Sequence, residues 1–305
     1  PVLGWVDIRT DSALNQLILI FGASYILFDG GATLRLRVLR EVWITIGVIS
    51  TLGVVITAAV TAVAAHFIFN LPWLIALLLG ATLASTDPAT LVPVFRQIKI
   101  KERVAQTVLS ESAFNDAMGA ILTFSVLALA MGGAAFSISH TLWELLWQSA
   151  VGIAAGAVLG YVVALLIAHQ HYRFLAEYAP AVTLMAVLGA YLGADGLQAS
   201  GFMAVFVFGI VLGNKELLGL RMEEGEAQKL DDFVLTTAFV LRLFIFILLG
   251  TQVDFGAMRE YLWGGIGLVL VFMFVARPLT VWLCAAPDRR ARCEAGKTPI
   301  IPSAG

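Results

Sequence analysis

The chain has 305 residues, of which 60% are hydrophobic and only 13% are charged, and its net charge is −2 at pH 7. A soluble domain is about one quarter charged, so this composition excludes an ordinary soluble protein. It predicts an all-α polytopic membrane protein, because a helix satisfies its own backbone hydrogen bonds in lipid. We expect membrane lipid around the chain, no nucleic acid partner and no enzyme activity.

Nine segments are apolar over lengths close to the ~20 residues that a spanning helix needs. The sixth and seventh are short and could form one tight hairpin. In chain order the nine segments are Ser12–Phe28, Val42–Ile68, Leu71–Phe95, Val104–Met131, Leu142–Ala168, Tyr178–Ala194, Ala199–Gly213, Phe233–Gly250 and Tyr261–Ala285.

The basic residues between these segments predict how the chain is oriented. Cytoplasmic loops carry an excess of Lys and Arg. If the N-terminus lies outside, the outward loops hold only Arg9 and Arg259. The inward loops then hold all of the following: Arg35, Arg37, Arg40, Arg96, Lys99, Lys101, Arg103, Arg173, Lys215, Arg221, Lys229, Arg289, Arg290, Arg292 and Lys297. We therefore expect a cytoplasmic C-terminus and an integral protein of the plasma (inner) membrane.

The fifth segment carries regularly spaced glycines, and the chain has two cysteines near its C-terminus. Gly152, Gly156 and Gly160 recur at four-residue spacing on the fifth segment and therefore share one helix face. That face fits either a dimer contact or, slightly favoured, close packing within one chain. Cys284 and Cys293 have no metal-ligand spacing, and we expect no cofactor.

The third segment contains Asp87 followed by Pro88. Proline breaks or kinks a helix, and broken helices at membrane depth are tolerated where they line protein or a water-filled cavity. A charged side chain inside a bilayer is costly, which favours a functional role for Asp87. The alternative is that Asp87 caps the second half of the helix.

The fourth segment places Glu111, Ser112, Asn115 and Asp116 within six residues. Residues three and four apart share a helix face, so these side chains form a strip of oxygen ligands. Carboxylate and hydroxyl oxygens suit a hard cation such as Na⁺. A buried carboxylate binds protons more readily, so it can exchange a proton for a cation. The alternative is a polar patch that holds two helices together.

Arg277 and Asp29 are further charged residues, at or inside the spans, that could belong to the site. Arg277 in the last segment needs a partner, and Glu111 is the first candidate, which would leave Asp116 to exchange protons. Asp29 ends the first segment before Gly30 and Gly31, and it is either a turn residue or a possible site residue.

The order LFDGG, TDP, ESAFND, FIFILLGTQVD and ARPLTV along residues 10–283 resembles the monovalent cation:proton antiporter family, in its electroneutral sodium/proton exchanger branch. The resemblance implies a fold with an interrupted helix at the ion site, working by alternating access as a homodimer, with a role in pH homeostasis. It implies that Asp116 binds cation and proton in turn. It further implies a Na⁺ site from Asp116, Asp87, Ser112 and Thr86, with Asn115 beside it and Glu111–Arg277 as a structural ion pair.

The resemblance also implies a division of the chain into functional regions. Residues 1–41 and 132–213 would lie on the dimerisation side, and residues 42–131 would form the transport core. Residues 214–232 would be a cytoplasmic linker, residues 233–286 would return to the core, and residues 287–305 would be a polar tail. Relative to the family, the chain is expected to be truncated at both ends.

The leading hypothesis is a transporter that exchanges Na⁺, or Li⁺ or K⁺, for H⁺. A K⁺/H⁺ antiporter of the same family, or a fragment that does not transport, are the nearest alternatives. An intramembrane aspartyl protease is remote, because neither Gly-Asp nor Tyr-Asp occurs in the chain. A channel on the same residues is disfavoured, because channels use rings of ligands around a continuous pore.

Overall fold

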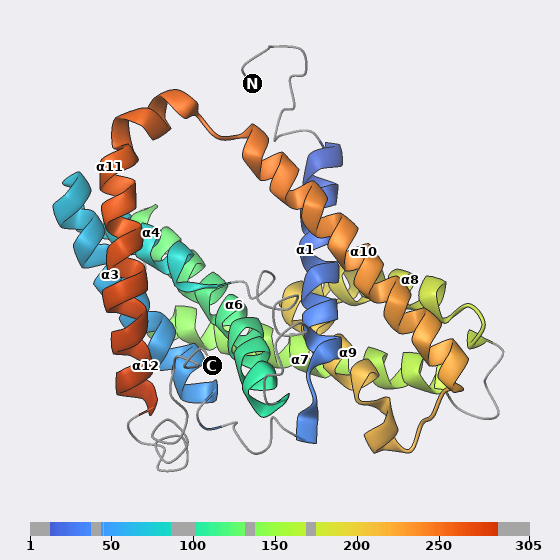
Figure 1. Ribbon diagram of the computed structural model, residues 1–305. Coiled ribbons are helices and arrows are strands. Elements are labelled where there is room, and N and C mark those ends of the chain that lie inside the picture. The colour runs from blue at the N-terminus through green and yellow to red at the C-terminus, as the bar shows by residue number, and fades with distance from the viewer. Residues whose placement is uncertain are drawn as a thin grey trace, which may run out of the picture. The chain divides into compact units, whose positions relative to one another are not determined.

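The computed structural model describes residues 13–37, 44, 46–86, 102–131, 138–168 and 175–285. All regular elements within these residues are helical (Figure 1). In chain order they are α1 (Ala13–Thr33), the π-helical turn η1 (Ile49–Gly53), α3 (Val54–Phe69), α4 (Trp73–Ala84), α6 (Glu102–Ala130), α7 (Ile138–Ala168), α8 (Ala179–Gly196), α9 (Gly201–Gly213), the 3₁₀ turn η3 (Lys215–Leu218), α10 (Glu224–Thr251), α11 (Phe255–Val271), the π-helical turn η4 (Phe272–Ala276) and α12 (Arg277–Ala285).

Each of the nine expected spans contains a helix in the described part of the chain. Six helices there are long and apolar enough to cross a membrane, and α4 and α9 are shorter apolar helices. The six are Asn15–Thr33, Ile46–Phe69, Trp147–Ala168, Ala179–Gly196, Glu224–Thr251 and Met258–Cys284. The prediction of an all-α polytopic membrane protein is therefore confirmed.

The chain divides into two compact units, each built from two separate stretches of sequence. The first unit comprises Pro1–Leu36 and Leu142–Arg259, and the second comprises Arg37–Thr141 and Glu260–Gly305. The expected regions and these two units divide the chain at different residues. Helix α10 belongs to the first unit, whereas only the last helices, from Glu260 onward, belong with residues 42–131. The dimerisation role expected for residues 1–41 and 132–213 stays a prediction.

In the first unit, helix α9 packs closely against both α1 and α7. A Cβ atom on Gly156 of α7 would lie 2.1 Å from the backbone oxygen of Ala204, so only glycine fits there. On the α1 side, a Cβ on Gly209 would lie 2.3 Å from the oxygen of Phe28. The glycines of α7 therefore serve packing within the chain, which was the slightly favoured interpretation.

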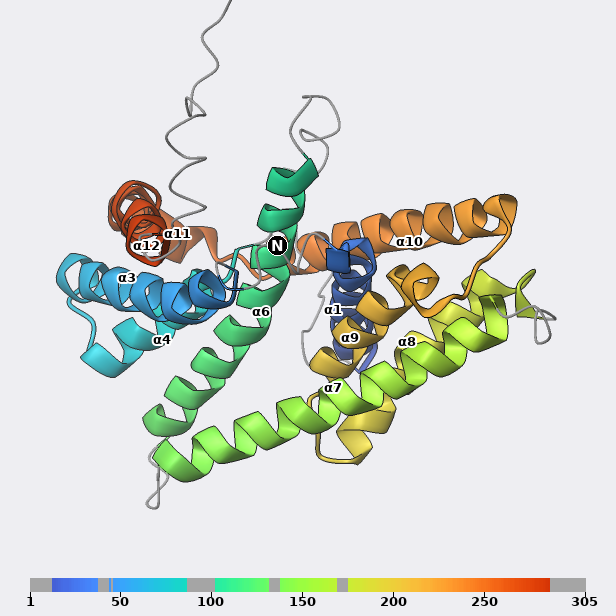
Figure 2. The same ribbon diagram turned by 90° about the horizontal axis from the view of Figure 1, so that it is seen from below.

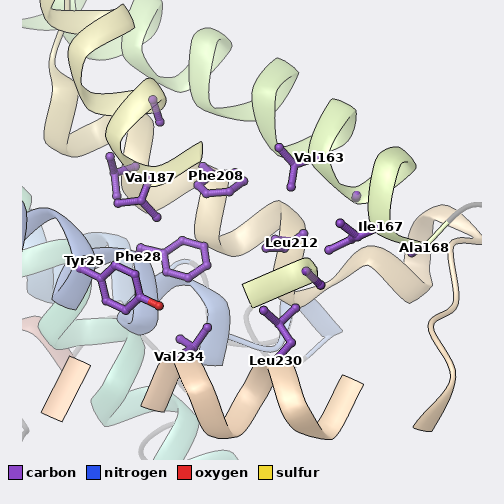
Figure 3. Packing of buried hydrophobic residues seen from close by; sticks show 14 of the residues in the cluster. Tyr25, Phe28, Val163, Ile167, Ala168, Val187, Phe208, Leu212, Leu230 and Val234 are labelled. Atoms are coloured by element: carbon purple, nitrogen blue, oxygen red, sulfur yellow. The ribbon is translucent and has the colours of Figure 1, made fainter. Parts of the chain in front are cut away.

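The hydrophobic core of the first unit joins α1, α7, α8, α9 and α10 (Figure 3). Phe28 and Phe208 stack at its centre with their ring centroids 5.0 Å apart. The labelled members are Tyr25, Phe28, Val163, Ile167, Ala168, Val187, Phe208, Leu212, Leu230 and Val234. Burial of Leu230 and Val234 explains why α10 packs with this unit.

Two helix boundaries in this unit differ from expectation. Helix α1 continues to Thr33, so Asp29 lies within the helix and its interpretation as a turn residue was wrong. Gly31 serves close packing instead, because a Cβ there would lie 2.3 Å from the oxygen of Phe206. Helix α10 begins at Glu224, so much of the expected linker 214–232 is helical. The acidic residues Glu224 and Glu226 in its first turn favour this earlier start.

In the second unit, α3 and α4 form a helical hairpin (Figure 2). Asn70 ends α3 in the left-handed conformation, with φ of 56°. The two helices touch at Gly80, where a Cβ would lie 2.3 Å from the oxygen of Ala58. Helix α6 packs against α4, and both η1 and α3 contact α12. This arrangement brings the polar residues that follow α4 together with those of α6 and α12.

Candidate functional site

The site begins where helix α4 ends. The helix stops at Ala84, and Ser85 is extended, with φ of −74° and ψ of 137°. The chain therefore leaves the helix four residues before Pro88, in the stretch where the sequence predicts an interruption. Backbone groups beyond such an end need new partners when they are away from water.

Side chains of α6 supply those partners. The Ser112 hydroxyl donates a hydrogen bond of 2.6 Å to the backbone oxygen of Thr86. The Asn115 side-chain oxygen accepts one of 3.4 Å from the Thr86 backbone N–H. Ser112 and Asn115 are both buried. The polar strip expected on α6 therefore faces the residues that directly follow α4.

Asn115 links the carboxylate of Glu111 to the end of α4. Its Nδ2 donates to Glu111 Oε1 at 3.0 Å and to Thr86 Oγ1 at 3.1 Å. Its side chain is fully buried. Both ends of the amide are thus occupied by protein groups, and Asn115 holds neighbouring residues in position.

Arg277 of α12 pairs with Glu111. Its Nη1 donates to Glu111 Oε1 at 3.2 Å, and its Nη2 contacts Thr86 Oγ1. The guanidinium also lies 5.9 Å from the ring centroid of Phe272. The ion pair that the sequence indicated is therefore formed, and the charge of Glu111 is balanced by that of Arg277.

Asp116 has a different environment from Glu111. The Ser85 hydroxyl donates a hydrogen bond to Asp116 Oδ1. Ser85 approaches α6 closely because Gly119, one turn beyond Asp116, has no side chain: a Cβ there would lie 2.9 Å from Ser85 Cβ. The two carboxylates of α6 are thus distinguished, one facing a guanidinium and one facing a hydroxyl.

The structure brings together six of the residues singled out in the sequence, and it adds Ser85 and Ser50. Ser85 directly precedes Thr86 in the STDP stretch, so its place at the break was a usable signal. Ser50, whose hydroxyl lies 3.4 Å from the Glu111 backbone oxygen, carries no local signal. The six residues are Thr86, Glu111, Ser112, Asn115, Asp116 and Arg277.

Two candidates are not part of this cluster as described. Asp87 lies outside the described residues. Asp29 lies on α1 in the first unit, whereas the cluster belongs to the second. The cluster offers carboxylate, hydroxyl and backbone carbonyl oxygens, which are the ligand types that hard monovalent cations take in proteins.

The comparisons with known proteins agree with this chemistry. A family model described as the transmembrane part of sodium/hydrogen exchangers matches residues 2–297. The chain belongs to this family. The resemblance drawn from the TDP and ESAFND motifs is thereby confirmed.

Curated relatives in the family include both sodium and potassium antiporters. The chain is 32% identical over 271 residues to Na⁺/H⁺ antiporter 1 of Methanocaldococcus jannaschii, covering 86% of this chain and 62% of that protein. It is 32% identical over 268 residues to the K⁺/H⁺ antiporter NhaP of Alkalimonas amylolytica, covering 86% and 44%. The chain thus spans less than two thirds of the length of these relatives.

A solved structure has the same fold. The sodium proton antiporter MjNhaP1 from Methanocaldococcus jannaschii superposes with a TM-score of 0.78 at 28% identity, covering 92% of this chain and 68% of that one. The family match extends over residues 2–297, and the shared fold covers 92% of this chain.

Proposed function

We propose that this chain carries the ion site of a secondary active transporter that exchanges Na⁺ for H⁺ by alternating access. The observation that carries the proposal is the unequal environment of two carboxylates on one helix. Glu111 is paired with Arg277, whereas Asp116 accepts a hydrogen bond from the Ser85 hydroxyl directly after the end of α4. An acid placed in that way can hold either a proton or a cation.

Competition for Asp116 couples the two fluxes. A carboxylate that must be neutralised within the membrane accepts a proton or a cation, and each excludes the other. Ser112 and Thr86 add oxygen atoms close to the same helix break. The Glu111–Arg277 pair carries no net charge. The exchange needs no cofactor beyond the transported ions.

Replacing Asp116 by Asn tests this proposal. The amide keeps the size of the side chain but cannot exchange a proton, so Na⁺-driven proton movement in proteoliposomes should fall by roughly 100-fold or more. Asp254→Asn is the matched control, because Asp254 is exposed and caps a turn by accepting from the Gly256 N–H at 2.8 Å. Transport that persists in the Asp116 variant would exclude the mechanism.

The same assay with Li⁺ and K⁺ gradients tests the choice of cation. Both Na⁺/H⁺ and K⁺/H⁺ antiporters occur among the relatives. Proton movement driven by K⁺ and not by Na⁺ would replace the sodium proposal by its alternative within the family.

We further propose a membrane orientation and an assembly. The clustering of Lys and Arg in alternate loops supports an outward N-terminus and a cytoplasmic C-terminus in the plasma (inner) membrane. The resemblance to the family supports a homodimer and a role in pH homeostasis.

A further inference from the structure

A buried pair of threonines lies between α3 and α12, away from the oxygen cluster. Thr57 Oγ1 and Thr280 Oγ1 are 2.9 Å apart, and both side chains are fully buried. Thr280 is three residues beyond Arg277 on α12, so the two share a helix face. A contact that holds Thr280 therefore also restricts where Arg277 can lie.

The hydroxyl and the methyl group of Thr280 both contact the continuous helix Ile46–Phe69, which comprises η1 and α3. Its hydroxyl bonds Thr57, and its methyl fits against Gly53, where a Cβ would lie 2.9 Å from Thr280 Cγ2. Threonine has a stiff χ1 angle because it is branched at Cβ. Gly53 and Thr57 are four residues apart and form a seat for Thr280.

Two π-helical turns adjoin this seat. The turn η1 ends at Gly53, and η4 ends directly before Arg277. Such turns are rare and occur frequently at functional sites. A π-helical turn contains more residues than an α-helical turn. Each added residue rotates the helix that follows by about 100°, because one α-helical turn has 3.6 residues. The turn η4 therefore contributes to the direction in which Arg277 leaves its helix.

The same helix also contacts the partner of Arg277. The Ser50 hydroxyl, within η1, lies 3.4 Å from the Glu111 backbone oxygen. One continuous helix, Ile46–Phe69, therefore touches Glu111 through Ser50 and holds α12 through Gly53 and Thr57.

We infer that Thr57 and Thr280 are positioning residues that hold the Arg277 guanidinium against Glu111 and Thr86. Among the described residues, their side chains bond to each other and not to the guanidinium or the candidate cation ligands. They therefore act through the placement of α12. The expected effect on transport rests on the proposed exchange. The coupling between Thr57 and Arg277 can be tested without a transport assay.

A double-mutant cycle on thermal stability tests the geometry in the purified protein. If Thr57 positions Arg277, the loss of Tm caused by Arg277→Gln should be smaller by about 2–4 °C in a Thr57→Val background than in the wild type. Thr61→Val is the matched control, because Thr61 is buried one turn further along α3 and its hydroxyl has no hydrogen-bond partner among the described residues. The control cycle should be additive. Additivity for Thr57 as well would overturn the inference.

Transport measurements then separate positioning from a purely structural role. Thr57→Val should lower turnover at saturating Na⁺ by about fivefold while changing the KM for Na⁺ by less than about twofold. Thr57→Ser keeps the hydroxyl and should restore turnover. Thr57→Val/Thr280→Val removes both polar groups, so stability should recover while turnover stays low.

Turnover that recovers together with Tm in Thr57→Val/Thr280→Val would overturn the inference, since a purely structural contact predicts that result. Absence of cation-driven proton movement in the wild type would instead refute the proposed function. The stability cycle would still decide whether Thr57 positions Arg277.

Discussion

At the scale of single residues, the site depends on Asn115 as much as on its acids. The amide donates to Glu111 and Thr86 and accepts from the Thr86 backbone. A buried amide can hold an acceptor and a donor at the same time, which a carboxylate cannot do without a proton. Asn115 therefore holds the broken end of α4 against α6.

Replacing Asn115 by Ala should destabilise the protein. The change leaves the Thr86 N–H and hydroxyl without this partner, at a cost of about 2–3 kcal/mol, so Tm should fall by about 5–10 °C. Thermal unfolding of the purified variant measures this loss. Asn115→Asp keeps the acceptor but loses both donors, and it should also be less stable than the wild type. A wild-type Tm in the Ala variant would contradict the linking role.

At the scale of elements, glycine determines how closely the helices approach. Gly152 and Gly156 of α7 face the backbone oxygens of Ser200 and Ala204 on α9, with Cβ positions 2.6 and 2.1 Å away. Lipid gives no hydrophobic drive for helices to associate, so close backbone packing contributes much of the association. Helix α9 is held in the first unit in this way.

Gly156→Ala should therefore separate α7 from α9. The new methyl group meets backbone rather than a flexible side chain, and we expect a loss of about 2–3 kcal/mol, or about 5–10 °C in Tm. Gly189→Ala on α8 is the matched control, because nothing lies within 4 Å of a Cβ there. Alanine is also the better helix former, so the control should keep its stability. Equal Tm values for both variants would show that the contact does not contribute.

At the scale of the whole molecule, each unit is assembled from distant parts of the sequence. Helix α1 packs with α9 and α10, and α12 packs with η1 and α3. The site accordingly needs Arg277, which lies 166 residues beyond its partner Glu111. Loops that join these helices carry the basic residues from which the orientation is proposed.

Labelling with a membrane-impermeant maleimide tests that orientation. In a cysteine-free background, Gln198→Cys lies in the turn between α8 and α9, and Glu224→Cys lies at the start of α10. Both positions are exposed. We expect Gln198→Cys to be labelled in intact cells and Glu224→Cys only after the membrane is opened. The opposite pattern would reverse the orientation.

The sequence by itself determined the class of the protein and most of its helices. Long apolar runs can only be helices in lipid, so all nine segments were predictable. The spacing of Glu111, Ser112, Asn115 and Asp116 also placed them on one face, because helical geometry alone dictates it. The expected end of α1 was wrong, because Gly30 and Gly31 suggest a turn when the packing of Gly31 against Phe206 is unknown.

The tertiary structure decided how the two carboxylates of α6 differ. The sequence offered Glu111 as the first candidate partner of Arg277, and the structure decided that choice. No local pattern says that Ser85 meets Asp116 or that Ser50 meets the Glu111 backbone. The contact of Thr280 with Gly53 and Thr57 likewise has no signal in the sequence, because Thr57 and Thr280 are 223 residues apart. Such contacts depend on the distances between packed helices, which residue spacing along one helix does not contain.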